Sequence, residues 1–295
     1  MYKERISLLI KAARPHTLPA SAVPVIVATA LAYSYGKVNL WVGMVCLIFA
    51  VIAQICANFA NDYFDFRSGV DAVGKNGRSH VLLNSNLSPN ILLKVGVVLM
   101  ALDCILGCSL IYVGGWSMLL VGLAVVLAVF MYSAGPFPLA YRACGEIAVV
   151  IFYGIIPIGF TFYLQTGTWT LLTTTAGLSF GLASACILIV NNYRDRETDK
   201  VCGKHTIIGM FGEAFGRRFY LVCGCVAFAL CGVQLTQGHY AAVLLPTIYL
   251  IQHICIWRSI SRIREGAALN AQLARTARNV CFFGVLFSLG LLLGW

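Results

Sequence analysis

The sequence predicts an all-α, polytopic membrane protein with nine transmembrane helices. Of its 295 residues, 60% are hydrophobic and only 11% are charged, whereas a soluble domain has about 25% charged residues. The apolar residues form long runs, and the lysines and arginines gather in alternate connectors. Lipid accepts apolar side chains all around a helix, but a soluble fold of this length cannot bury so many.

Residues 2–13 predict an amphipathic helix that lies in the membrane interface. Its charged side chains include Lys3, Arg5 and Lys11. The apolar side chains on one side of the helix are Ile6, Leu9, Ile10 and Ala13. A cleaved signal peptide needs an unbroken apolar core of about 7–15 residues. Lys11, Arg14 and Pro15 interrupt this stretch, so we expect no such signal here.

Nine later segments are apolar over about 20 residues, the length that crosses the hydrocarbon core. These predicted spans are residues 17–36, 40–61, 91–113, 116–134, 146–165, 169–190, 218–236, 240–257 and 277–294. Long polar connectors separate some of them, and short turns separate the others. We therefore expect one membrane domain over residues 1–295.

The positive charges predict the orientation of these spans. With nine spans, every one of the 21 lysines and arginines except Lys37 falls on the same side of the membrane. The positive-inside rule makes that side cytoplasmic, with the N-terminus inside and the C-terminus outside. The net charge of +10 is then explained by topology and anionic lipid. No separate domain is left for binding nucleic acid, so we expect no nucleic-acid partner.

Six of the eleven acidic residues fall in two short segments that directly follow the second and sixth spans. In the first, Asn61 and Asp65 share a helix face, and the chain then leads to Asp71. In the second, a ladder spaced by four residues contains Asn191, Asp195 and Asp199. Asp62 and Glu197 point elsewhere by periodicity.

Stacked carboxylates repel one another unless a cation lies between them, and Mg²⁺ prefers one or two carboxylates together with phosphate oxygens. Basic side chains follow each acidic segment: Lys75 and Arg78 after the first, and Lys204 after the second. Carboxylate, metal, phosphate and then Lys or Arg form a charge-balanced stack, so we expect the two segments to face each other and hold a magnesium-bound diphosphate. Their repetition also predicts an internal duplication, with residues 17–134 and 146–257 as two similar bundles and residues 277–294 added.

These motifs resemble those of the UbiA superfamily of intramembrane prenyltransferases. The segment Asn61-Asp62-x-x-Asp65 with Asp71, and the pair Asp195-x-x-x-Asp199, are similar to the two aspartate motifs of that family. Residues 14–20 resemble the family's entry to its first span. Residues 132–139, together with Gly145-Glu146, resemble the connector before the fifth span in the menaquinone branch. The loop at 74–81 departs from the Gly-Pro-x-Arg pattern of that branch, which leaves the acceptor open.

The resemblance implies a helical bundle around a central cavity and transfer of a polyprenyl group from a polyprenyl diphosphate to an aromatic acceptor. The implied acceptor is 1,4-dihydroxy-2-naphthoate, as in menaquinone biosynthesis, with 4-hydroxybenzoate as the alternative. It also implies two Mg²⁺ ions, a bacterial inner membrane, and a full set of metal ligands consisting of Asn61, Asp65, Asp71, Asn191, Asp195 and Asp199.

Other side chains are candidates for binding the substrates. For the diphosphate they are Lys75, Arg78, Lys204 and Asn192; for the allylic cation they are Tyr63, Tyr132, Tyr153 and Tyr193. Arg14 or Arg142 is a candidate for holding the carboxylate of the acceptor, and each is equally well explained as a determinant of topology. We expect Asp65→Ala and Asp199→Ala to leave folding intact and to abolish turnover.

One alternative from a different class is an ion-coupled transporter. Asp103 stands alone in the third span, and an acid inside the membrane is a functional candidate by default. Transporters place their coupling acids near the middle of the bilayer, whereas the acidic segments here lie at the ends of spans. The placement of the acids favours the transferase.

Overall fold

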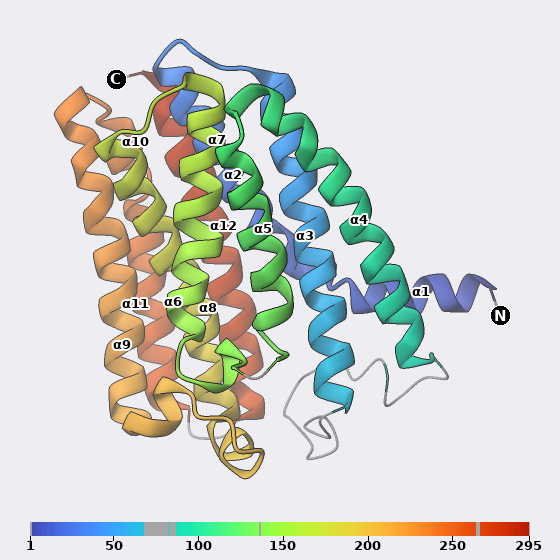
Figure 1. Ribbon diagram of the computed structural model, residues 1–295. Coiled ribbons are helices and arrows are strands. Elements are labelled where there is room, and N and C mark those ends of the chain that lie inside the picture. The colour runs from blue at the N-terminus through green and yellow to red at the C-terminus, as the bar shows by residue number, and fades with distance from the viewer. Residues whose placement is uncertain (1, 68–81, 83–86, 136, 264–265, 295) are drawn as a thin grey trace.

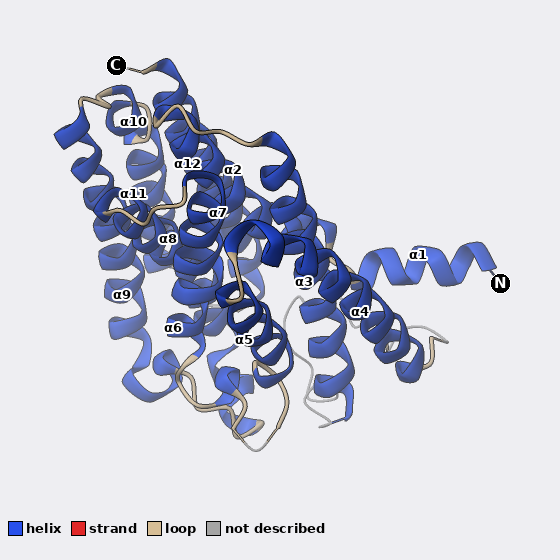
Figure 2. Cartoon of the chain, turned by 45° about the horizontal axis from the view of Figure 1, so that its top comes forward, coloured by secondary structure: helices blue, strands red, loops and turns tan. Residues whose placement is uncertain are grey.

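The computed structural model describes residues 2–67, 82, 87–135, 137–263 and 266–294, which form a helical bundle without any strand. Figures 1 and 2 show its long helices running side by side. The membrane-spanning elements are α2 (Leu18–Ser34), α3 (Leu40–Arg67), α4 (Pro89–Gly114), α5 (Ser117–Met131), α6–η4–α7 (Gly145–Val150, Ile151–Ile155, Ile156–Thr166), α8 (Leu171–Val201), α9–η5 (Ile207–Cys231, Gly232–Gln237), α10–α11 (Ala241–Leu244, Thr247–Arg262) and α12 (Asn270–Leu293).

Each of the nine predicted spans coincides with one of these elements, which confirms the fold class. Within the described residues, eight are long and apolar enough to cross a membrane, and α5 is shorter. Its 15 residues reach about 22 Å at 1.5 Å per residue, against roughly 30 Å of hydrocarbon. Turns at Gly115 and Gly135, both at positive φ, bound α5 and shorten the predicted span.

The predicted N-terminal helix is α1 (Tyr2–Ala12), which lies across the direction of the bundle instead of joining it (Figures 1 and 2). Leu8, Leu9 and Ala12 pack against a cluster that includes Phe59 of α3. Ile6 and Ile10 are exposed, which suits a helix whose outer apolar side chains meet lipid. Arg14, at φ 52, makes the sharp change of direction between α1 and α2.

Close helix contacts hold α8 against the η4 segment. A Cβ placed on Gly154 would lie 2.2 Å from the Gly177 carbonyl oxygen and 2.5 Å from the Gly181 Cα. The two α8 glycines are four residues apart, the spacing that lets transmembrane backbones approach each other. Also on α8, Phe180 stacks on Phe283 of α12 with ring centroids 4.5 Å apart. These contacts fix the helix that carries the second acidic segment.

Candidate active site

A large cavity runs between the helices and ends at both acidic segments. Its volume is about 990 Å³, at the upper end of the range for small-molecule pockets. The walls away from the acidic segments are mostly apolar and include Phe49, Met100, Leu110, Val121, Val125, Phe152, Ile156 and Phe160. The polar end is lined by Arg14, Asn58, Asn61, Asp65, Tyr141, Asn191, Arg194, Lys204 and Asn270. An apolar chain with a charged head fits this distribution.

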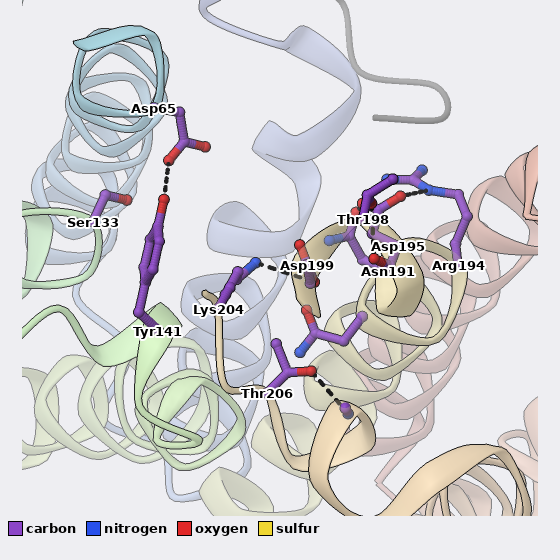
Figure 3. A network of polar contacts seen from close by, with 12 residues as sticks. Asp65, Ser133, Tyr141, Asn191, Arg194, Asp195, Thr198, Asp199, Lys204 and Thr206 are labelled. Atoms are coloured by element: carbon purple, nitrogen blue, oxygen red, sulfur yellow. Dashed lines mark hydrogen bonds and ion pairs between the residues drawn. The ribbon is translucent and has the colours of Figure 1, made fainter. Parts of the chain in front are cut away.

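The end of α3 brings Asn61 and Asp65 to the cavity, as their spacing predicts. The hydroxyl of Tyr141 donates a hydrogen bond to Asp65 Oδ1 at 3.1 Å, and Figure 3 shows this contact. Asn61 donates to the hydroxyl of Ser133 at 2.8 Å. Arg14 forms an ion pair with Asp62, so Asp62 turns away from the Asn61–Asp65 face and holds Arg14 at the cavity.

The end of α8 is arranged differently, because Arg194 covers Asp195. Its Nε donates to Asp195 Oδ1 at 2.8 Å and its Nη2 to Oδ2 at 2.7 Å. Nη2 also donates to Asn191 Oδ1 at 2.9 Å, and Nη1 donates to Asn270 Oδ1 of α12 at 2.9 Å. Asn191 and Arg194 line the cavity, while Asp195 is 2% exposed behind the guanidinium (Figure 3).

Lys204 is brought back to Asp199 by the cap that ends α8. Gly203 adopts positive φ, its N–H donates to the carbonyl of Lys200, and the Lys204 N–H donates to the carbonyl of Asp199 at 2.8 Å. This is the Schellman arrangement, which glycine favours at its left-handed position. Lys204 Nζ then lies 3.7 Å from Asp199 Oδ2, and both side chains are buried.

Several predicted site residues lie elsewhere. Asn192 donates to Glu146 Oε1 at 2.9 Å and does not line the large cavity. Tyr63 and Tyr193 are buried against Arg67 and Arg217, whose guanidinium groups donate to their hydroxyls. These positions do not suit contact with a substrate in the cavity.

Tyr132 and Tyr153 do line the cavity, and the hydroxyl of Tyr153 donates to Gln54. Arg14 lines the cavity too, whereas Arg142 is exposed with its guanidinium 4.9 Å from the centre of the Phe137 ring. Of the two arginines proposed for the acceptor, only Arg14 is placed to reach it. Asp71, Lys75 and Arg78 lie outside the described residues.

Four residues at the polar end were not predicted: Asn58, Tyr141, Arg194 and Asn270. The sequence places Arg194 between Asn191 and Asp195. An arginine next to an aspartate in such a segment is a signal for an ion pair within the segment. Tyr141 reaches the site because the connector before α6 pairs with the loop after α8, where the His205 N–H donates to the Tyr141 carbonyl at 3.1 Å. Nothing in the local sequence marks that pairing.

The polar end fits Mg²⁺ on the α3 side. Asp65 and Asn61 line the cavity, and Asn61 Oδ1 accepts a long contact of 3.5 Å from Arg14 Nη2. Mg²⁺ prefers such carboxylate and amide oxygens, and it needs only one or two carboxylates when a phosphate supplies further ligands. Within the described residues, no three acids, histidines or cysteines gather closely enough to hold a metal by themselves. The donor set therefore suits a metal bound together with its diphosphate.

A model of the UbiA prenyltransferase family matches residues 21–275. The chain belongs to this family. Prenyl transfer is therefore its class of reaction, and the transporter alternative is wrong.

Two relatives match the chain over nearly its whole length. It is 28% identical to a 1,4-dihydroxy-2-naphthoate octaprenyltransferase of Haemophilus influenzae, covering 100% of this chain and 98% of that protein. It is also 28% identical to the protein of the same name from Bacillus subtilis, covering 98% and 93%. A solved structure of a UbiA homologue from Archaeoglobus fulgidus, bound to DMAPP and Mg²⁺, has a TM-score of 0.65 at 13% identity and covers 95% of this chain and 99% of that one. This last likeness supports the fold.

Proposed function

We propose that this UbiA-family protein transfers a polyprenyl group from a polyprenyl diphosphate to 1,4-dihydroxy-2-naphthoate, in a magnesium-dependent step of menaquinone biosynthesis. The observation that carries the proposal is the cavity of about 990 Å³, which joins apolar walls to Asp65, Arg194 and Lys204 at one end. The names of the two octaprenyltransferases that match along the whole chain support the acceptor.

The reaction breaks the bond between the first prenyl carbon and the diphosphate oxygen. Asp65 and Asn61 on α3 are the residues that would hold Mg²⁺, which would supply Lewis-acid stabilisation of the departing diphosphate when bound. Lys204 and Arg194 add positive charge from the α8 side, where both line the cavity. The apolar walls keep water from the allylic cation that results.

The allylic cation then forms a carbon–carbon bond with the electron-rich ring of the acceptor, at the carbon that carries the carboxylate. Loss of carbon dioxide restores the aromatic ring and leaves its bonding electrons there. Tyr132 and Tyr153 line the cavity, and an aromatic face stabilises a nearby cation by about 0.5–2 kcal/mol. Arg14 is our candidate for orienting the acceptor carboxylate, because its guanidinium reaches the same end of the cavity.

We further propose a bacterial plasma membrane with the N-terminus and the polar end of the cavity facing the cytoplasm. Lys37 alone among the 21 lysines and arginines falls on the opposite side in this arrangement. The family resemblance implies two Mg²⁺ ions. A solved structure of the same fold with Mg²⁺ and DMAPP supports the use of the metal.

The test is an assay with purified protein in lipid nanodiscs, Mg²⁺, a polyprenyl diphosphate and each acceptor in turn. We expect a prenylated, decarboxylated product from 1,4-dihydroxy-2-naphthoate and none when EDTA replaces Mg²⁺. A product from 4-hydroxybenzoate alone would overturn the acceptor and leave the reaction class standing. Activity that is unchanged in EDTA would overturn the metal dependence.

A further inference from the structure

Arg194 occupies the position where the sequence pattern predicts a second metal ion. Asn191 and Asp195 are spaced by four residues on α8, like Asn61 and Asp65 on α3, and both were expected to bind magnesium. Instead, their oxygens accept three hydrogen bonds from the guanidinium of Arg194, at 2.7–2.9 Å. The cation between these two side chains is part of the protein.

The guanidinium is held too firmly to be an incidental neighbour. Besides Asn191 and Asp195 it contacts Asn270 of α12, so two helices fix its orientation. Four of its five N–H groups are engaged by these contacts within the described residues, in the forked geometry that makes arginine–carboxylate pairs strong. Removing Arg194 from Asp195 would leave a buried carboxylate, 2% exposed, without its bidentate partner.

Among the described residues, both aspartates on α8 already face a positively charged side chain. Asp195 is matched by Arg194 at 2.7 Å, and Asp199 is matched by Lys204 at 3.7 Å. A divalent ion inserted between these groups would meet two buried positive charges at close range. On the α3 side, Asp65 accepts a hydrogen bond from the hydroxyl of Tyr141, and Arg14 reaches the pair only at Asn61 Oδ1, with its Nη2 at 3.5 Å.

We propose that Arg194 is a resident cation that takes the place of one divalent metal, so that the diphosphate is bound by Mg²⁺ from the α3 side and by Arg194 from the α8 side. One N–H on Nη1 remains after the four contacts to the protein, and Arg194 lines the cavity. That N–H is the donor we assign to a diphosphate oxygen. The inference rests on the proposed function, since it concerns the same diphosphate.

The experiment counts metal ions. Full-length protein in nanodiscs is titrated with Mn²⁺ in the presence of geranyl thiolodiphosphate, an analogue whose bridging oxygen is replaced by sulfur, and bound Mn²⁺ is measured by electron paramagnetic resonance. We expect one tightly bound Mn²⁺ per chain in the wild type and a second in Arg194→Gln, because Asn191 and Asp195 are then open to a metal.

Two further variants separate this role from a structural one. Arg194→Lys keeps the positive charge, so we expect one Mn²⁺ and roughly tenfold weaker binding of the analogue, because the Nη1 donor to the diphosphate oxygen is lost. Arg196→Gln is the matched control: Arg196 is two residues away and pairs with Glu213 at 2.5 Å. We expect it to bind one Mn²⁺ with wild-type affinity. If Arg194→Gln does not fold, the number of Mn²⁺ ions bound by Arg194→Lys still tests the role of Arg194.

The outcomes distinguish this inference from the proposed function. Two Mn²⁺ ions in the wild type, or a count that stays at one in folded Arg194→Gln, would overturn the role of Arg194 and leave the prenyltransferase standing. Two ions in Arg194→Lys would also overturn it. A wild-type protein that binds neither Mn²⁺ nor the analogue would overturn the proposed function and this inference together.

Discussion

The two acidic segments have the same sequence pattern and different surroundings. On α3, Asn61 and Asp65 line the cavity, and Asp65 accepts a hydrogen bond from Tyr141. On α8, Asp195 pairs with Arg194 and Asp199 pairs with Lys204, and neither aspartate lines the cavity. The α3 segment presents oxygens to a ligand, whereas the α8 segment presents cations that its aspartates hold in place.

The residue before each central aspartate accounts for much of this difference. Phe64 precedes Asp65, and Arg194 precedes Asp195. The arginine is long enough to fold back over its own helix end and form a forked pair with the next residue. Equal spacing of acids therefore does not imply equal roles. On α8, the arginine between the two spaced residues takes up their oxygens and presents its own positive charge to the cavity.

The largest effect is expected from Asp65→Asn, which removes the negative charge that faces the cavity from α3. Losing several kcal/mol of Lewis-acid stabilisation corresponds to a fall in kcat/KM of about a thousandfold. The measurement is prenyl transfer at saturating Mg²⁺, with the melting temperature as a check on folding. Near-normal turnover in a folded Asp65→Asn protein would remove the basis for treating the α3 segment as the metal side.

Asp199→Asn is expected to act on stability as well as on activity, which changes the expectation from sequence that its removal leaves folding intact. Asp199 and Lys204 are both buried, and removing one partner of a buried ion pair costs about 3–5 kcal/mol. We expect a lower melting temperature together with lower activity. Glu197→Gln is the control on the same helix, with a side chain 71% exposed, and should leave both unchanged.

An unchanged melting temperature in Asp199→Asn would show that Lys204 does not depend on this carboxylate. The contrast with Asp65→Asn, which we expect to lose activity without a comparable loss of stability, is the sharpest mutational test of the difference between the two segments.

Gly154→Ala tests whether close packing fixes the position of α8. The added Cβ would lie 2.2 Å from the Gly177 carbonyl oxygen, and overpacking of this kind costs about 1–3 kcal/mol. We expect a lower melting temperature and reduced activity through displacement of Arg194 and Lys204. Gly122→Ala on α5 is the control, because no atom lies within 4 Å of its added Cβ. Equal melting temperatures for the two variants would contradict the packing argument.

Tyr141→Phe is expected to have the smallest effect, because it removes one hydrogen bond to Asp65 and keeps the ring. Loss of a group that orients a metal ligand lowers activity or metal affinity by about 10–100-fold, and we expect the lower end here. Arg142→Gln is the neighbouring control, since Arg142 is exposed away from the cavity. The measurement is the activity of each variant as a function of Mg²⁺ concentration. We expect Tyr141→Phe to need more Mg²⁺ than the wild type, and Arg142→Gln to need the same amount.

The fold and half of the site follow from local patterns in the sequence. The length of the apolar segments predicts the spans. Helical spacing places Asn61 and Asp65 together at the cavity and points Asp62 elsewhere, and the structure pairs Asp62 with Arg14. Gly203 after α8 is also a readable signal, because a glycine at a helix end favours the cap that returns Lys204 to Asp199.

The rest depends on contacts between distant parts of the chain. Tyr141 and Asp65 are 76 positions apart in the sequence, and the path of the connector between α5 and α6 decides that they meet. The same holds for Arg194 and Asn270. Periodicity also places Asp195 correctly on its helix face without revealing that Arg194 covers it, since helix spacing does not determine the rotamer of a long side chain.

The central claim is that Mg²⁺ bound through Asp65 holds the diphosphate at the polar end of the cavity. Its most direct test is the affinity of the nanodisc protein for geranyl thiolodiphosphate, measured by isothermal titration calorimetry with Mg²⁺ or with EDTA. The account predicts tight binding that requires Mg²⁺ in the wild type and is lost in folded Asp65→Asn. Equal affinity with and without Mg²⁺, or in both proteins, would contradict it.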